Sequence, residues 1–229
     1  MLKPMLKTLV LSLIIGSFSS CEKESSLDVS QDKIYTDYEV FYNSNTDKSW
    51  VVAKFKFGGS TGTILELENP AFVLFENDTL PYNFFFNGHY KEYAGQITSG
   101  TFSYRDVNGN IYNNSLPNYE DIQFPPDLDT ISKSQAFDLK WDGTTLSEDQ
   151  YVGLFIGSWA WGQDALFVQT NQGADNLVLG TTQLANLPLG NSTCYMDRTT
   201  QLDVTEGTGE GGKIRGKFRA TNVPVIITE

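Results

Sequence analysis

The sequence predicts an all-β protein built from antiparallel β-sandwiches. Short apolar runs recur at close intervals with Gly, Asn, Asp and Thr between them, and aromatic residues make up 13% of the chain. No pattern of a long amphipathic helix occurs, which disfavours α/β layers. Removing residues 1–20 from the 229 leaves 209, enough for one large β domain or two of about 100 residues each.

Strands of the first half are predicted from alternation and from turn pairs. Between Ser49 and Phe57 the sequence alternates, which places Val51, Ala53 and Phe55 on one face of a strand. The dipeptides Asn87-Gly88 and Asn108-Gly109 favour hairpin turns. Further strands are expected at residues 63–67, 71–75, 80–86, 89–93, 101–105 and 111–112.

A proline pair marks the boundary between two predicted domains. Pro125 and Pro126 cannot continue a sheet interior, so we predict β-sandwich domains at residues 33–124 and 125–229. A last strand at 223–227 is expected at a sheet edge, because Pro224 has no N–H to donate. Other strands of the second half are expected at residues 136–141, 151–156, 165–169, 177–179, 194–204 and 213–220.

The segment from Phe137 to Trp141 loosely resembles a strand of immunoglobulin-like domains, in which a strand tryptophan packs against the core. The two cysteines that flank this tryptophan in antibody domains are absent. The resemblance implies two immunoglobulin-like β-sandwiches after the amino-terminal segment.

Residues 1–20 have the three zones of an export signal. Lys3 and Lys7 precede an apolar run at 9–15, and small residues at 17–20 lead to Cys21. The apolar run is shorter than the roughly 20 residues of a membrane-spanning helix. Because Met1-Leu2-Lys3 recurs as Met5-Leu6-Lys7, translation from either methionine keeps a lysine before this run.

Ser19-Ser20-Cys21 resembles the lipobox of bacterial lipoproteins, although Phe18 stands where that family prefers Leu. The resemblance, closest to Bacteroidota-type envelope lipoproteins, implies cleavage before Cys21 and lipid on its sulfur. The polar segment 21–32 is then a lipidated flexible tether. The expected location is the bacterial cell envelope, on the periplasmic or the surface side of the outer membrane. A plain secretory signal is the alternative.

Charge and cysteine content exclude several classes of protein. Without Lys3 and Lys7 the chain has 14 basic and 28 acidic residues, which argues against nucleic acid as a partner. Lipidation of Cys21 leaves Cys194 unpaired, and we expect it to be buried. No cysteine or histidine cluster has the spacing of a zinc site, and no cofactor is predicted.

Catalytic patterns are weak. His89, the only histidine, follows the Asn87-Gly88 turn and is expected to be exposed at a hairpin tip, so Ser-His or Cys-His chemistry is disfavoured. Two carboxylates for glycoside hydrolysis occur somewhere in any acidic protein and carry no specificity. Residues 106–110 superficially match a calcium loop, but the position that needs Glu is Pro117, which favours a hairpin turn.

Trp159 and Trp161 form the most interesting cluster, because residues two apart on a strand share a face. On one interpretation the two indoles stack on sugar rings, with Gln163 and Asp164 bonding hydroxyls. On the other, which is the more usual position for tryptophan, both are buried in the core. Tyr82, Phe84, Phe86, Tyr90 and Tyr93 are expected to be core side chains of a hairpin.

The sequence therefore predicts a non-enzymatic, membrane-anchored module that binds glycan. The alternatives are a structural or adhesive envelope module that binds another protein and, disfavoured, a secreted hydrolase.

Overall fold

The computed structural model describes residues 24–157 and 162–229, and nearly all regular structure in them is β, which confirms the all-β prediction. The short helices are η1 (Gln31–Lys33), η2 (Phe84–Phe86) and α1 (Thr181–Leu184). The strands of the first half are β1 (Glu24–Ser25), β2 (Ile34–Asn43), β3 (Lys48–Phe57), β4 (Thr63–Glu66), β5 (Phe72–Phe75), β6 (Asp78–Thr79), β7 (Tyr82–Asn83), β8 (Gly88–Ala94), β9 (Thr101–Arg105) and β10 (Ile111–Ser115). Those of the second half are β11 (Thr130–Ser132), β12 (Phe137–Lys140), β13 (Gln150–Gly157), β14 (Asp164–Gln169), β15 (Asn176–Leu179), β16 (Gly190–Asp203), β17 (Gly212–Arg219) and β18 (Val223–Thr228).

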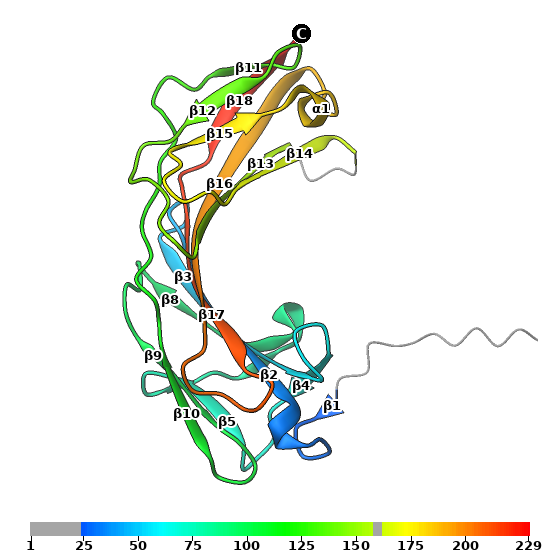
Figure 1. The fold of residues 1–229 in the computed structure, drawn as a ribbon, viewed down its shortest axis with the longest axis vertical. Helices are drawn as coiled ribbons and strands as arrows, with labels where there is room; N and C mark the ends of the chain where they lie inside the picture. The colour runs from blue at the N-terminus through cyan, green and yellow to red at the C-terminus, as the bar shows by residue number, and fades with distance from the viewer. Residues whose placement is uncertain (1–23, 158–161) are drawn as a thin grey trace, which may run out of the picture.

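One large mixed sheet runs through the whole molecule and bends it into a crescent (Figure 1). Its strand order is β1-β4-β3-β2-β17-β16-β13-β14, with β8 and β7 attached at β3, and β18 and β11 attached at β16. A four-stranded sheet, β10-β9-β5-β6, covers the convex side of the first half. The β12–β15 pair covers the second half. The concave side of the large sheet therefore faces the opening of the crescent.

The two halves are joined by a parallel pairing between β2 and β17, in register from Thr36–Gly212 to Asn43–Arg219. Two further pairings, β1 with β4 and β11 with β18, are also parallel. The prediction of purely antiparallel sheets is therefore wrong at these three places. β17 contributes Ile214 to one core and Phe218 to the other, so the large sheet belongs to both halves.

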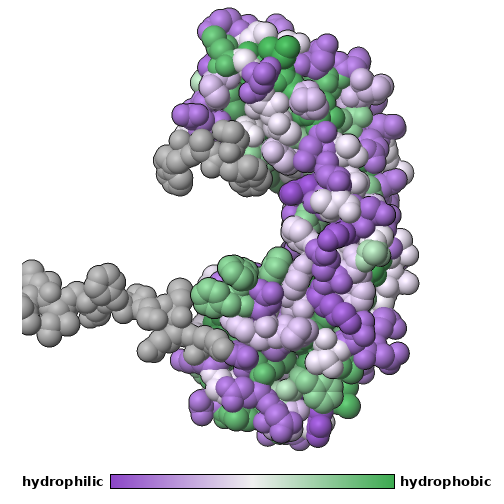
Figure 2. Space-filling view, turned by 180° about the vertical axis from the view of Figure 1, so that it is seen from behind, coloured by the Kyte–Doolittle hydropathy of each residue, from purple (hydrophilic) through white to green (hydrophobic). Residues whose placement is uncertain are grey.

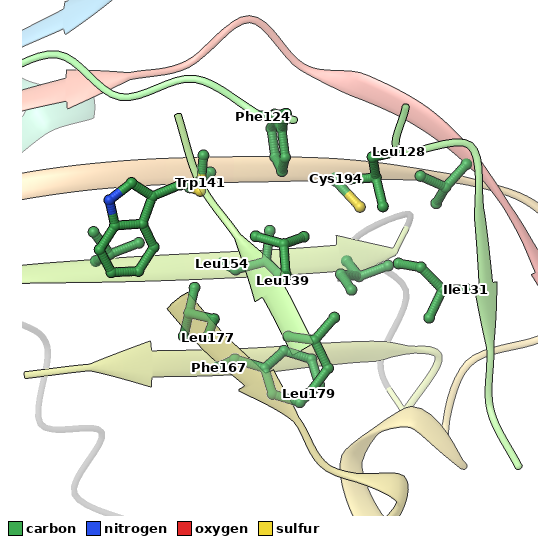
Figure 3. Close-up of a cluster of buried hydrophobic side chains, with 14 of the residues drawn as sticks. Phe124, Leu128, Ile131, Leu139, Trp141, Leu154, Phe167, Leu177, Leu179 and Cys194 are labelled. Carbon is green, nitrogen blue, oxygen red and sulfur yellow. The ribbon is translucent and has the colours of Figure 1, made fainter. Parts of the chain in front are cut away.

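Each half has its own hydrophobic core. The core of the first half is rich in aromatic rings, and Tyr38 stacks on Phe102 with ring centroids 4.6 Å apart. The core of the second half is mainly aliphatic. Figure 3 shows Leu139, Leu154 and Cys194 of β12, β13 and β16 meeting in it.

Tyr119 lies where the two cores meet and packs against both. Its hydroxyl donates a hydrogen bond to the Ile97 carbonyl at 2.5 Å. Its ring lies over Gly216 of β17, where a Cβ atom would stand only 2.4 Å from the ring. Gly216 is therefore required for this close contact between the linking segment and the shared sheet.

Most predicted strands of both halves are present, but four local predictions need correction. β2 was not predicted, although its buried residues Ile34, Thr36, Tyr38 and Val40 alternate with half-buried ones. Residues 80–86 form the two-residue β7 and η2 rather than one strand. The last strand, β18, is a sheet edge only from Val223 to Val225, because it pairs with β11 from Ile226 onward as well as with β16.

The fourth correction concerns the predicted tether at 21–32. Cys21 lies outside the described residues, but Glu24 and Ser25 pair with β4, so the chain is already part of the sheet there. Ser26 is buried, and the Gln31 side chain donates to the Ser26 carbonyl at 2.7 Å. Residues 24–32 therefore pack on the first half instead of forming a free linker.

Candidate functional site

The candidate site is the concave face of the large sheet. Because side chains alternate along a strand, the rows that bury Tyr38 and Phe55 leave a second row on the opposite face. In the part of the chain that the structure describes, no second layer covers this row, and Figure 2 shows the molecule hollowed there. Two adjacent grooves lie along the face, which we call the N-groove and the C-groove.

The N-groove has a volume of about 330 Å³. Arg215 lies in it between two carboxylates, with its Nη2 atom 2.5 Å from Asp37 Oδ1 and its Nε atom 3.2 Å from Glu39 Oε2. Although burial disfavours the guanidinium charge, these two carboxylates outweigh that effect and raise the pKa of Arg215. The lining residues are Asp37, Glu39, Phe41, Trp50, Val52, Lys54, Phe86, Arg215, Lys217 and Arg219.

A row of aromatic rings crosses the N-groove. Trp50 contacts Phe41 edge to face at 5.2 Å and Phe86 at 5.9 Å, and Phe86 stacks on Tyr90 at 4.0 Å. The Trp50 Nε1 atom donates to Glu92 Oε2 at 3.1 Å. These contacts fix the indole in one orientation, with its ring half-buried at the groove surface.

Lys217 and Arg219 line both grooves, and Asp197 of the C-groove binds both of them. Its carboxylate accepts two hydrogen bonds from Arg219, at 2.7 and 2.8 Å, and pairs with Lys217 at 2.8 Å. The cations of Lys217 and Arg219 lie 4.8 and 5.0 Å from the centre of the Phe41 ring. Bidentate geometry holds the guanidinium plane, so the cations that line both grooves are positioned before any ligand arrives.

The C-groove has a volume of about 550 Å³ and is more apolar. Leu166 and Val168 of β14 expose 62% and 57% of their surface, and β14 ends the strand order of the large sheet. Monomeric soluble proteins rarely expose an apolar edge strand of this kind. The lining residues are Tyr151, Gly153, Phe155, Asp164, Leu166, Val168, Tyr195, Asp197, Thr199, Lys217 and Arg219.

Only part of the predicted ligand site can be placed. Asp164 begins β14 and lines the C-groove, and Gln163 is exposed just before it. Trp159, Trp161 and the lipidation residue Cys21 lie outside the described residues, so those predictions stay predictions. Trp50 was not predicted as a site residue. It lies on the same face of its strand as Lys54, and a lysine on that face indicates that the face is not part of the core.

His89 is not at an exposed hairpin tip, because it pairs with Ala53 of β3 and its side chain reaches the segment that follows β4. The side chain is buried, Nε2 accepts the Leu67 N–H at 3.2 Å, and Nδ1 lies 2.9 Å from the Leu80 carbonyl. These partners assign the proton to Nδ1. Both ring nitrogens are therefore engaged in structural hydrogen bonds.

The hairpin interpretation of residues 106–110 agrees with the structure. Both carboxylate oxygens of Asp106 accept hydrogen bonds from Asn110, at 2.8 Å each.

Cys194 is buried as predicted, and burial raises the pKa of its thiol to about 12. Within residues 24–157 and 162–229, no group of three His, Cys, Asp or Glu side chains is placed to hold a metal ion. None of the helices described there is long and apolar enough to cross a membrane.

The aromatic hairpin of the first half is not a set of core side chains. Phe84 is 76% exposed, because residues 84–86 form η2 and do not alternate as a strand would. Phe86 and Tyr90 lie on the concave side, and Tyr93 packs against the core and donates to Asp78 at 3.0 Å. Two of these five aromatic residues thus belong to the aromatic row of the N-groove.

Comparison with known proteins gives little guidance. No family model and no curated protein matches the sequence. Among solved structures, the chain matches one from a study of how a 1.5-MDa bacterial ice-binding adhesin is retained at the host cell surface, with 13% identity and a TM-score of 0.24. The match covers 85% of this chain and 66% of that chain, just under two thirds of its length. A superposition at this TM-score carries no argument about function.

Proposed function

We propose that this chain is a lipid-anchored binding module of a bacterial cell envelope that holds an extended glycan along its concave face. The observation that carries the proposal is the pair of adjacent grooves on the uncovered side of the sheet, lined by aromatic rings and by charged side chains held in ion pairs. No catalytic step is part of the proposal. The only histidine has both ring nitrogens hydrogen-bonded inside the first half.

The chemistry of the N-groove suits a sugar chain. A pyranose presents C–H groups on its faces and hydroxyls at its edges, so it needs aromatic surface beside fixed donors and acceptors. Trp50 and Phe86 supply the aromatic surface. The guanidinium of Arg215 supplies donors and the carboxylate of Glu39 supplies acceptors, and the two charges neutralise each other. A neutral hydroxyl bonds to such a pair without leaving a buried charge unpaired.

The sharing of Lys217 and Arg219 by both grooves favours an extended ligand over a small one. A chain of several sugar units would cross β3, β2, β17 and β16 in turn. Asp164 would then contact its far end in the C-groove, as the sequence predicts for a hydroxyl partner.

The proposed anchorage rests on the resemblance of Ser19-Ser20-Cys21 to a lipobox, and the proposed location is the bacterial outer membrane, on its periplasmic or surface side. Each buried methylene of an acyl chain contributes about 0.8 kcal/mol, so two or more chains hold the protein stably. Replacement by Cys21→Ala should move the protein from the membrane fraction to the soluble fraction. Retention of the variant in the membrane would contradict the proposal.

A protein ligand is the second candidate, favoured by one observation. Leu166 and Val168 form an exposed apolar stripe on β14, whose outer edge has no paired strand among the described residues. A strand of another envelope protein could extend the sheet there, with these two side chains packing against it.

The discriminating experiment is a titration of the mature chain with a panel of bacterial cell-surface polysaccharides, followed by calorimetry and by tryptophan emission. Trp50→Ala should weaken binding by about tenfold, the equivalent of about 1.4 kcal/mol. Ile111→Ala, on the convex sheet and 59% exposed, is the matched control and should bind like the wild type. Absence of binding across the panel, or equal affinity of the Trp50 variant, would refute glycan binding at the N-groove.

A further inference from the structure

The turn η2 presents two adjacent phenylalanines to solvent. Phe84 and Phe85 are 76% and 91% exposed, and their ring centres are 6.2 Å apart. Scattered exposed apolar side chains need no explanation, but such a projecting pair does. Figure 2 shows a hydrophobic projection beside the opening of the crescent, at the height at which Figure 1 places η2.

The pair is held in place by its neighbours. The Asn83 side chain accepts hydrogen bonds from the backbone N–H groups of Phe85 and Phe86, at 2.9 and 3.4 Å. Asn87 closes the turn in the left-handed conformation, with φ of 46°. Phe86 stacks on Tyr90 below the turn. The two exposed rings are thus presented by a fixed backbone, which lowers the entropy cost of inserting them into another phase.

The length of chain before β1 indicates what that phase is. Cys21 precedes Glu24 by three residues, and three residues span at most about 11 Å. Because Glu24 is fixed on β4 opposite Leu65, a lipid on Cys21 must lie close to this end of the first half.

β1 and η2 lie at the same edge of the sheet. β1 pairs with β4, and the Leu67 N–H that follows β4 donates to His89. His89 in turn pairs with Tyr82, two residues before η2. Figure 1 shows β1 and η2 projecting on the same side of the lower half. An anchor at Cys21 therefore brings Phe84 and Phe85 towards the membrane.

We propose that Phe84 and Phe85 insert into the interfacial layer of the membrane that holds the Cys21 lipid and so fix the orientation of the protein on it. This inference rests on the lipidation of Cys21 within the proposed function. The chain has 16 basic and 28 acidic residues, so the contact is apolar and does not depend on anionic lipid. A second contact point restricts rotation about the short link to Cys21, which a lipid alone would leave free.

The test uses the full lipidated chain, reconstituted in phosphatidylcholine vesicles with brominated acyl chains. A Phe85→Trp variant places a reporter at the proposed contact, and Leu166→Trp is the matched control on the exposed edge strand. After subtraction of the emission of the four native tryptophans, recorded on the wild type, we expect the Phe85→Trp signal to shift to the blue and to be quenched by at least half relative to unbrominated vesicles. The wild type and the control should change by less than a fifth of their intensity.

Mass spectrometry of Cys21 separates the possible failures. An acylated protein whose Phe85→Trp reporter is unquenched overturns the membrane contact and leaves the anchorage intact. An unacylated Cys21 overturns both. If Phe84→Ser with Phe85→Ser weakens polysaccharide binding tenfold while the reporter stays unquenched, the pair contacts the glycan, and the membrane contact is refuted.

Discussion

The two halves of the crescent pack their cores with different side chains and offer different surfaces on the concave face. In the first half, tyrosine and phenylalanine rings fill the core, and the N-groove above it is lined by ion pairs. In the second half the core is mainly aliphatic, and the C-groove is lined by exposed Leu166 and Val168. Since one sheet serves both, this difference comes from side chains and not from backbone architecture.

The stability of the two halves depends on different interactions. Buried tyrosines make the first half depend on pH, because an ionised phenol is costly in an apolar core. The second half contains the one fully buried arginine among the described residues, Arg198, and depends on its hydrogen bonds. Four substitutions or conditions test this division, in order of decreasing effect.

Replacement by Arg198→Met should cost about 3 kcal/mol in the free energy of unfolding. Its guanidinium donates to the Thr144 and Thr145 carbonyls at 3.0 and 3.1 Å and to Gln150 Oε1 at 2.6 Å, all of which would lose a partner. The matched variant is Arg215→Met on the concave face, with an expected cost of about 1 kcal/mol, because Asp37 keeps its ion pair with Lys56 and Glu39 is partly exposed. Urea unfolding measures both; equal costs would remove the distinction between the halves.

Gly216→Ala should cost about 2 kcal/mol, because the added methyl would overlap the Tyr119 ring where the two cores meet. The control is Gly153→Ala on the concave face, where no atom lies within 4 Å of the added Cβ, and little change is expected. We also expect the Gly216 variant to unfold in two steps by circular dichroism and tryptophan emission. A single transition with wild-type midpoint would show that the junction does not couple the halves.

Alkaline pH should loosen the first half before the second. Burial raises the pKa values of Tyr38 and Tyr104, and that of Tyr119 at the junction to about 12. Tyrosine is neutral when protonated, so the stabilising effect is complete below the unfolded pKa of about 10 and is lost as pH rises towards the folded values. At pH 10 we expect a total loss of about 1 kcal/mol from these three phenols. Faster amide exchange in β2 and β9 than in β13 would confirm the prediction, and uniform exchange would contradict it.

The smallest effect is expected for the double change Leu166→Ser with Val168→Ser. Both side chains are exposed, so the free energy of unfolding should change by less than about 0.5 kcal/mol. If glycan binds mainly through the N-groove, its affinity should stay within about twofold of the wild type. A tenfold loss would assign the main contact to the C-groove and reverse the comparison.

Local sequence patterns were sufficient to predict most strands, because the alternation of apolar and polar residues indicates which residues share a face. The Val51, Ala53 and Phe55 row is buried as predicted, and the same pattern places Trp50 and Lys54 on the concave face. β2 alternates in the same way, but its outward row contains Asp37 and Glu39, residues that are depleted in strands and hide the pattern. Their acidic charge is explained by Arg215 on β17, and that of Asp37 also by Lys56 on β3.

Long-range pairing could not be predicted from the sequence. β2 and β17 are about 175 residues apart, and no local pattern specifies that they pair in parallel. The concave face and both grooves depend on this pairing, because Asp37 and Arg215 come from different ends of the chain. His89 was misplaced for a related reason. Its turn was identified correctly, but its burial depends on β4, more than 20 residues earlier.

The parallel pairing of β2 and β17 also determines how the protein would bear a pulling force. The proposed anchor lies before the start of β2, whereas the second half is attached beyond the end of β17, so tension between membrane and ligand pulls the two strands past each other lengthwise. In this shear geometry all eight residue pairs from Thr36–Gly212 to Asn43–Arg219 resist together, whereas a strand peeled from its end yields one bond at a time. The pairing that creates the concave face would then also resist load along its whole length.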